Sequence, residues 1–164
     1  MRNADFEANL IAQLTLQRLH IGVALPPLPG QEGGGAKVLM SGLDFERAVL
    51  TGGPLGIMAA CMDAVVPYVH DRQQFGQPVA DFQNTQFMLA DMATDLEAAR
   101  ALLYMAATKV TANAPDKSRF SAMAKRLATD NGSKIVNDAL QLFGGYGYLK
   151  DYPIERFWRD LRVH

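Results

Sequence analysis

The segment Asp71-Arg-Gln-Gln-Phe-Gly-Gln-Pro78 separates two long segments that have the periodicity of amphipathic helices. Before it, apolar residues recur at steps of three and four from Lys37 to about His70. After it, the same spacing continues from about Asp81 to Ala112. Apolar residues at this spacing line one face of a helix, and glycine and proline favour a turn. The sequence therefore predicts two long helices joined by a short turn.

A third helical segment follows a break at Asn113-Ala-Pro-Asp116 and runs to about Phe143, where a glycine turn begins. A shorter helix is expected from Pro153 to Leu161, with proline in its first turn. Long helices joined by short loops predict an all-α, up-and-down helical bundle. Only three of the helices are long, so the predicted bundle lacks its last long helix. Residues 1–20, a partner subunit or a segment missing from an incomplete chain would have to cover the remaining apolar faces.

The first 36 residues differ in character from the rest. Their apolar residues fit neither period clearly, and Pro26-Pro27 and Gly33-Gly34-Gly35 indicate a loop over residues 22–36. We therefore divide the chain into an N-terminal segment with a proline- and glycine-rich linker, residues 1–36, and a helical domain, residues 37–164. Within the first long helix, Gly52-Gly53-Pro54 predicts a kink with close packing, which we favour over ligand contact.

Composition excludes several classes of function. The formal net charge of −1 gives no bulk attraction to nucleic acid or to anionic lipid. Cys61 is the only cysteine, which excludes an intramolecular disulfide, and its apolar surroundings predict a buried, inert thiol. We find no apolar run close to the roughly 20 residues that span a bilayer and no targeting peptide. We therefore expect a soluble intracellular domain that binds neither nucleic acid nor membrane, with no metal site.

Two turns could bind a ligand. In the first, Arg72, the glutamine amides and Gly76 suit an anionic group such as a pyrophosphate, although an arginine at a helix C-terminus also complements the helix dipole. The second reads Gln141-Leu-Phe-Gly-Gly-Tyr-Gly-Tyr148. Its three glycines in four positions exceed what a helix cap needs, and they allow a flat ligand to approach the backbone.

A third group lies in the early part of the first long helix and reads Gly42-Leu-Asp-Phe-Glu-Arg47. Carboxylates near a helix start are favoured by the helix dipole, so Asp44 and Glu46 can be read as solvated charges. The functional alternative makes Glu46 a general base that projects from a rigid element into an apolar pocket.

Together, these motifs resemble the C-terminal domain of the acyl-CoA dehydrogenase family, from about Gly30 to the end of the chain. Val38-Leu-Met-Ser-Gly-Leu-Asp-Phe-Glu-Arg47 and Gly52-Gly-Pro-Leu-Gly56 make residues 37–80 most similar to the isovaleryl-CoA branch. Leu89-Ala-Asp-Met-Ala-Thr94 and Gly144-Gly-Tyr-Gly-Tyr-Leu-Lys-Asp-Tyr152 make residues 81–164 more similar to isobutyryl-CoA and other short-branched-chain members.

The resemblance implies a site that binds FAD between the subunits of a homotetramer. The matching Arg72 and Gln83 would contact the flavin dinucleotide of a neighbouring subunit. The matching residues from Gln141 through Leu142, Phe143 and Gly144 to Gly145 would hold its adenosine–pyrophosphate portion. Glu46 would take the α-proton of an acyl-CoA, and Asp44 and Arg47 would line the path of the CoA substrate.

The resemblance also implies an activity and a setting. The reaction is the α,β-dehydrogenation of a short branched-chain acyl-CoA such as isovaleryl-CoA, a step of branched-chain amino acid catabolism, with an electron-transfer flavoprotein as electron acceptor. The location is the cytoplasm of a bacterium or, in a eukaryote, the mitochondrial matrix. Most of the family carries its base on a loop shortly after the segment matched by Arg159-Asp160, which is an alternative to Glu46.

The family's N-terminal helical and β domains have no match in this sequence. We therefore expect a fragment, or a truncated or rearranged gene product, that alone binds FAD weakly and turns over nothing. The main alternative is a catalytically inactive helical module that binds flavin or oligomerises, and a plain helical bundle with coincidental glycine turns is the third.

Overall fold

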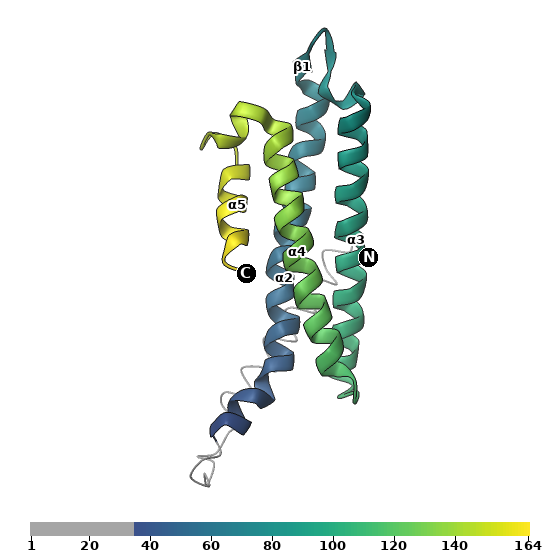
Figure 1. The fold of residues 1–164 in the computed structure, drawn as a ribbon, viewed down its shortest axis with the longest axis vertical. Helices are drawn as coiled ribbons and strands as arrows, with labels where there is room; N and C mark the ends of the chain where they lie inside the picture. The colour runs from purple at the N-terminus through teal and green to yellow at the C-terminus, as the bar shows by residue number, and fades with distance from the viewer. Residues whose placement is uncertain (1–34) are drawn as a thin grey trace.

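The structure, a computed structural model, describes residues 35–164 as three long antiparallel helices with a short helix beside them (Figure 1). In chain order the elements are α2 (Gly35–Asp71), β1 (Gln73–Gln74), β2 (Gln77–Pro78), η1 (Val79–Asp81), α3 (Gln83–Thr111), α4 (Lys117–Phe143), η2 (Gly144–Tyr148) and α5 (Ile154–Arg162). The prediction of an all-α, up-and-down bundle with three long helices and one short helix is confirmed. Residues 1–34, which include the possible extra helix over residues 1–20, lie outside the described residues.

The first long helix continues through Gly52-Gly53-Pro54 without a break. Gly53 lies against the imidazole of His164, and a Cβ added there would come within 2.9 Å of the ring atom Cε1. This contact agrees with the expected close packing at the glycine pair. The first turns of α2 extend past the ends of α3 and α4 at one end of the bundle (Figure 1). Their side chains Val38, Leu39 and Met40 are exposed by 45%, 71% and 61%.

The core forms where α4 packs against both α2 and α3. Small residues on α4 allow this close approach, and Ala124, Ala128 and Ala139 are completely buried. Gly132 admits a neighbouring helix most closely, because a Cβ there would lie 3.1 Å from Leu161 of α5 and 3.5 Å from Met58 of α2. The short helix α5 thus packs against the bundle by its buried Ile154 and Leu161.

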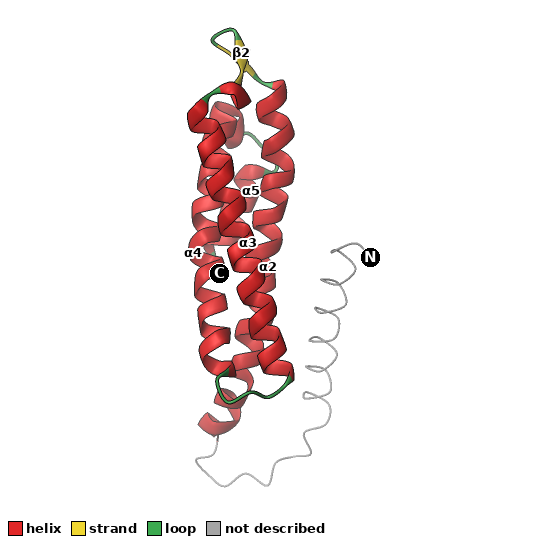
Figure 2. Ribbon diagram, turned by 90° about the vertical axis from the view of Figure 1, so that its right-hand side faces the viewer, coloured by secondary structure: helices red, strands yellow, loops and turns green. Residues whose placement is uncertain are grey.

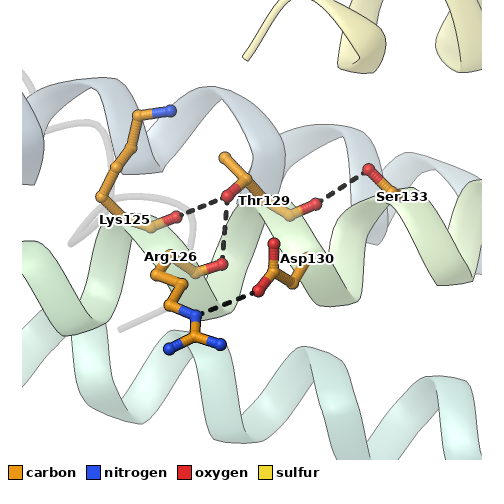
Figure 3. A network of polar contacts seen from close by, with 5 residues as sticks. All are labelled: Lys125, Arg126, Thr129, Asp130 and Ser133. Atoms are coloured by element: carbon orange, nitrogen blue, oxygen red, sulfur yellow. Dashed lines mark hydrogen bonds and ion pairs between the residues drawn. The ribbon is translucent and has the colours of Figure 1, made fainter.

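Several polar side chains of α4 bond to groups of the same helix (Figure 3). The Thr129 hydroxyl donates to the carbonyl oxygens of Lys125 and Arg126, at 2.9 and 3.0 Å, and Ser133 donates to the carbonyl of Thr129 at 2.9 Å. Arg126 pairs with Asp130 one turn further along, at 3.4 Å. These bonds are local and need no partner from a neighbouring helix.

One described helix, α2, is long and apolar enough to cross a membrane by length and composition. Its most apolar 18-residue window has a mean hydropathy of 1.6, so the prediction that no such run exists is wrong on this measure. However, core helices pass the same test, and the fully buried Met58, Val65 and Val69 of α2 belong to the bundle core.

Cys61 lies in the same core and is completely buried. Burial raises the pKa of its thiol to about 12, because a thiolate would lose its hydration there. The prediction of a buried cysteine is confirmed, and the raised pKa favours the protonated thiol over the reactive thiolate.

Candidate functional site

The predicted turn after α2 is a small antiparallel hairpin at one end of the bundle (Figure 2). Gln73 pairs with Pro78 and Gln74 with Gln77, which leaves Phe75 and Gly76 as a two-residue loop. Both loop residues have positive φ, 53° for Phe75 and 83° for Gly76, as a type I′ turn requires. Arg72 lies between the last residue of α2 and this hairpin, so the rigid end of a long helix fixes its backbone.

The second turn follows α4 directly. Gly144 ends α4 with φ 58° and ψ −136°, and the chain then tightens into η2. Gly147 is buried, and a Cβ there would lie 2.7 Å from the carbonyl oxygen of Leu140. By contrast, a Cβ at Gly144 or Gly145 would meet nothing within 4 Å. Gly147 therefore folds the turn, while Gly144 and Gly145 leave their backbone open to a ligand.

An aromatic cluster joins the two turns. The ring of Tyr68 on α2 stacks on Phe143 of α4 with centroids 3.9 Å apart, and its hydroxyl donates to the Phe143 carbonyl oxygen at 3.2 Å. Tyr152 lies edge-on to both rings, at 5.8 and 5.3 Å. Desolvation by these neighbours raises the pKa of Tyr68, although the nearby Arg72 cation acts in the opposite direction. This packing sets the end of α2 against the end of α4.

Between the turns lies a cavity of about 440 Å³. It is lined by Tyr68, Arg72, Gln74, Val79, Leu142, Phe143, Gly144, Gly145, Tyr146 and Leu149. Five of the predicted cofactor-binding residues, Arg72 and residues 142–145, thus lie together. Gln83 at the start of α3 and Gln141 near the end of α4 are exposed and are not among the lining residues.

The cavity combines a cation, bare backbone and aromatic faces. Among residues 35–164, none of the ion pairs involves Arg72, so its guanidinium donors are available to an anion. A guanidinium pairs well with phosphate oxygens. The open backbone of Gly144 and Gly145 admits a flat group. These groups fit the pyrophosphate and adenosine of a dinucleotide.

Tyr68, Val79 and Leu149 also line the cavity but belong to neither predicted turn motif, and Tyr146 lies within the second motif without a predicted role of its own. A signal for Tyr68 existed, because it precedes Arg72 by four residues and so shares a helix face with it. Its stacking on Phe143, 75 residues away, leaves no trace in a single sequence.

Asp44, Glu46 and Arg47 lie far from this cavity, in the third and fourth turns of α2. Asp44 accepts a hydrogen bond from the Ser118 hydroxyl of α4 at 2.6 Å and lies 3.8 Å from the Arg47 guanidinium. The reading of Asp44 and Glu46 as charges at a helix start is wrong, because α2 begins at Gly35 and the dipole effect is confined to the first turn. Asp44 connects α2 to α4, and Glu46 is half-buried beside it.

The separation of the two regions follows from helix geometry. Glu46 precedes Arg72 by 26 residues of an almost entirely continuous helix. At a rise of 1.5 Å per residue, their backbone positions are about 39 Å apart along the helix. Glu46 and Arg72 of one chain therefore lie at distant points along the bundle.

His164 docks on the face of α2 that carries Glu46. Gly53, which contacts the His164 ring, follows Glu46 by seven residues, or about two helical turns. Lys125 of α4 holds the His164 carbonyl oxygen at 2.6 Å. His164, four residues after Asp160, therefore lies on the same side of α2 as Glu46.

The described residues contain no group of three or more His, Cys, Asp or Glu side chains that could hold a metal ion.

Comparison with known proteins adds independent evidence. Residues 33–164 match the family model described as "Acyl-CoA dehydrogenase, C-terminal domain". The chain is 47% identical over 137 residues to the mitochondrial isobutyryl-CoA dehydrogenase of Dictyostelium discoideum, a match that covers 84% of this chain and 33% of the relative. It is 44% identical to the mitochondrial isovaleryl-CoA dehydrogenase of Solanum tuberosum, over 82% of this chain and 32% of the relative.

A solved structure has the same fold. The butyryl-CoA dehydrogenase of Megasphaera elsdenii superposes with a TM-score of 0.78 at 42% identity, over 82% of this chain and 35% of the other. The chain thus spans about a third of the length of the relatives it matches.

Proposed function

The chain belongs to the acyl-CoA dehydrogenase family, and from that premise we propose that it is the helical, flavin-binding part of an enzyme that dehydrogenates short branched-chain acyl-CoA thioesters such as isovaleryl-CoA. The observation that carries the proposal is the cavity in which the Arg72 hairpin meets the Gly144-Gly145 turn. Because the chain spans a third of its relatives' length, the activity belongs to an assembly that includes further domains. The isolated chain binds FAD weakly and turns over nothing.

In this proposal the cavity holds the dinucleotide part of FAD. Arg72 pairs with pyrophosphate oxygens, and the bare backbone at Gly144 and Gly145 accommodates the adenosine beside Leu142 and Phe143. Gln83 and Gln141 are exposed at the adjoining helix ends, where their amides can reach the same ligand. When bound, FAD supplies the acceptor for the hydride that leaves the β-carbon of the substrate.

Glu46 is the proposed general base. Its carboxylate takes the α-proton as the Cα–H bond breaks, and a carbon–carbon double bond forms as the β-hydrogen leaves with its electron pair. A half-buried position on a rigid helix suits this role, because the carboxylate is held in place and partly desolvated. Arg47 and Asp44 line the approach of the CoA substrate, and the Ser118 hydrogen bond fixes Asp44.

Helix length makes a second copy part of the proposal. Since about 39 Å separates Glu46 from Arg72, each site takes its base from one chain and its dinucleotide cradle from another. A homotetramer satisfies this requirement, with an electron-transfer flavoprotein as acceptor of the electrons. The proposed location is a bacterial cytoplasm or a mitochondrial matrix.

The alternative function is an inactive module that binds flavin and oligomerises. The exposed Val38, Leu39 and Met40 on the projecting start of α2 favour it, because apolar patches of this kind usually bind a partner. The two proposed functions differ in whether Glu46 removes the α-proton of a substrate.

The cavity is tested by titrating the purified chain with FAD and following the anisotropy of flavin fluorescence. We expect saturable but weak binding, and Arg72→Ala should weaken it by about 10- to 100-fold, because a charge-assisted hydrogen bond contributes about 1.5–3 kcal/mol. Arg126→Ala is the matched control, since Arg126 is an exposed arginine on the outside of α4. Equal FAD affinity of the wild-type chain and of Arg72→Ala would show that Arg72 only complements the helix dipole at the end of α2. Tight stoichiometric binding, visible as flavin absorbance in the purified protein, would contradict the expected weakness.

The base is tested in an assembly to which the complementary domains have been supplied. Glu46→Gln keeps the size of the side chain and removes its basicity, so exchange of the substrate α-proton with deuterated water should cease while FAD stays bound. Mass spectrometry of the acyl-CoA measures the exchange. If exchange persists, the base lies elsewhere, most simply after the Arg159-Asp160 segment. If no assembly of either chain supports exchange, the inactive module is the better description.

A further inference from the structure

Arg72 is held by an aromatic ring. Its guanidinium carbon lies 5.2 Å from the centroid of the Tyr146 ring, within cation–π range. Tyr146 belongs to η2 and lines the same cavity, yet 42% of its surface is exposed. The contact therefore joins the two turns across the mouth of the cavity.

Tyr146 is itself fixed in place. Its ring meets Tyr152 at 5.7 Å in an edge-to-face contact, and Tyr152 packs in turn on Phe143. The neighbouring Gly147 is buried against Leu140, which fixes the backbone next to the ring. The Tyr146 ring is therefore held in a fixed orientation beside the Arg72 guanidinium.

A ring face and a carboxylate hold an arginine in different ways. A carboxylate would occupy the N–H donors of the guanidinium, whereas a ring face attracts the cation and leaves the donor edges free. Within residues 35–164 Arg72 has the ring and none of the ion pairs. A guanidinium held this way loses less freedom when it pairs with an anion.

We propose that Tyr146 is a positioning residue whose ring orients the Arg72 guanidinium over the cavity for pairing with phosphate oxygens. The proposal rests on the proposed function for its ligand, a pyrophosphate. It assigns to Tyr146 a role distinct from that of Gly144 and Gly145, which give the ligand room. The competing role is direct stacking of Tyr146 on the flat ring of the ligand.

The stacking is tested first without any ligand. In ¹⁵N-labelled chain, the Arg72 Nε–H signal, identified by its loss in Arg72→Ala, should be shifted by the ring current of Tyr146. Tyr146→Leu should abolish the shift, and Tyr146→Phe should keep it. Tyr148→Leu is the matched control, because Tyr148 lies in the same turn, is 84% exposed and is not a lining residue of this cavity. An Arg72 signal that Tyr146→Leu leaves unmoved would overturn the proposal.

The effect on binding is tested by calorimetric titration of the chain with ADP, which carries the adenosine and the pyrophosphate. Tyr146→Leu should raise the Kd by about two- to fivefold, the equivalent of the 0.5–1 kcal/mol of an exposed cation–π contact. Tyr146→Phe should restore most of the affinity, and thermal unfolding of all variants should show that they are folded.

A double-mutant cycle separates positioning from direct stacking. In the Arg72→Ala background, Tyr146→Leu should have no further effect on the Kd, because the ring acts through the arginine. An additional loss of the same size in that background means that Tyr146 stacks on the ligand itself, which contradicts the proposal. An Arg72→Ala variant that binds ADP as the wild type does, or a wild-type chain that shows no saturable binding, overturns the proposed function instead. The Nε–H signal still decides the stacking in that case.

Discussion

Gly145 and Gly147 stand two residues apart in one turn, yet they tolerate a side chain very differently. A Cβ on Gly147 would lie 2.7 Å from a backbone oxygen, whereas a Cβ on Gly145 would meet nothing within 4 Å. The two glycines therefore separate folding from binding. One is required by the packing of the turn, and the other keeps the cavity open.

This contrast gives a prediction at the residue scale. Gly147→Ala should lower the free energy of unfolding by about 1–3 kcal/mol, because a backbone carbonyl cannot move aside as a flexible side chain can. Gly145→Ala should leave stability close to that of the wild type and weaken FAD binding instead, since it adds a methyl group to the cavity wall. Urea unfolding and flavin anisotropy measure the two effects. Equal loss of stability in both variants would show that Gly145 and Gly147 do not have separate roles in binding and folding.

At the scale of elements, the helices were largely predictable from sequence. The predicted end of the third helix at Phe143 is confirmed, because Gly144 adopts the positive φ that a terminating glycine favours. The predicted second helix, Asp81 to Ala112, begins two residues before α3 and ends one residue after it, since η1 first occupies Val79–Asp81. The paired strands of two residues were missed, because strands this short carry no alternation.

The site was only partly predictable, because a local sequence pattern does not specify contacts between distant segments. Arg72 and Gly144 could be predicted from local sequence, because Arg72 is a cation that follows a helix and Gly144 is a glycine at the end of one. The aromatic cluster of Tyr68, Phe143 and Tyr152 depends on how α2 and α4 pack, which no local pattern specifies. The remoteness of Glu46 from Arg72 follows only once α2 is known to continue through Pro54, where the sequence predicts a kink.

The docking of α5 gives a prediction at the element scale. Leu161→Ala should lower the free energy of unfolding by about 2–5 kcal/mol, because it leaves a cavity over Gly132 where α5 meets α4. Trp158→Ala, on the same helix but 45% exposed, is the control and should change stability by about 0.5 kcal/mol. Thermal unfolding followed by circular dichroism compares them. Similar melting temperatures for the two variants would mean that α5 contributes little to the bundle.

At the scale of the whole molecule, the proposed function makes a prediction about how copies associate. In the proposed function, each chain contacts another, as the exposed start of α2 and the separation of Glu46 from Arg72 suggest. Light scattering coupled to size-exclusion chromatography should therefore give a single species of four chains. A monomer would contradict the proposed assembly, and a polydisperse profile would indicate that the chain alone has lost it.

The length of α2 has a genetic consequence. If one end of the helix serves one flavin and the other end serves another, lesions at Glu46 and at Arg72 disable different halves of a shared site. A mixed assembly of two such defective chains would contain some sites that draw an intact Glu46 from one parent and an intact Arg72 from the other. Two alleles that are each inactive could then complement one another, whereas two lesions at the same end of α2 could not.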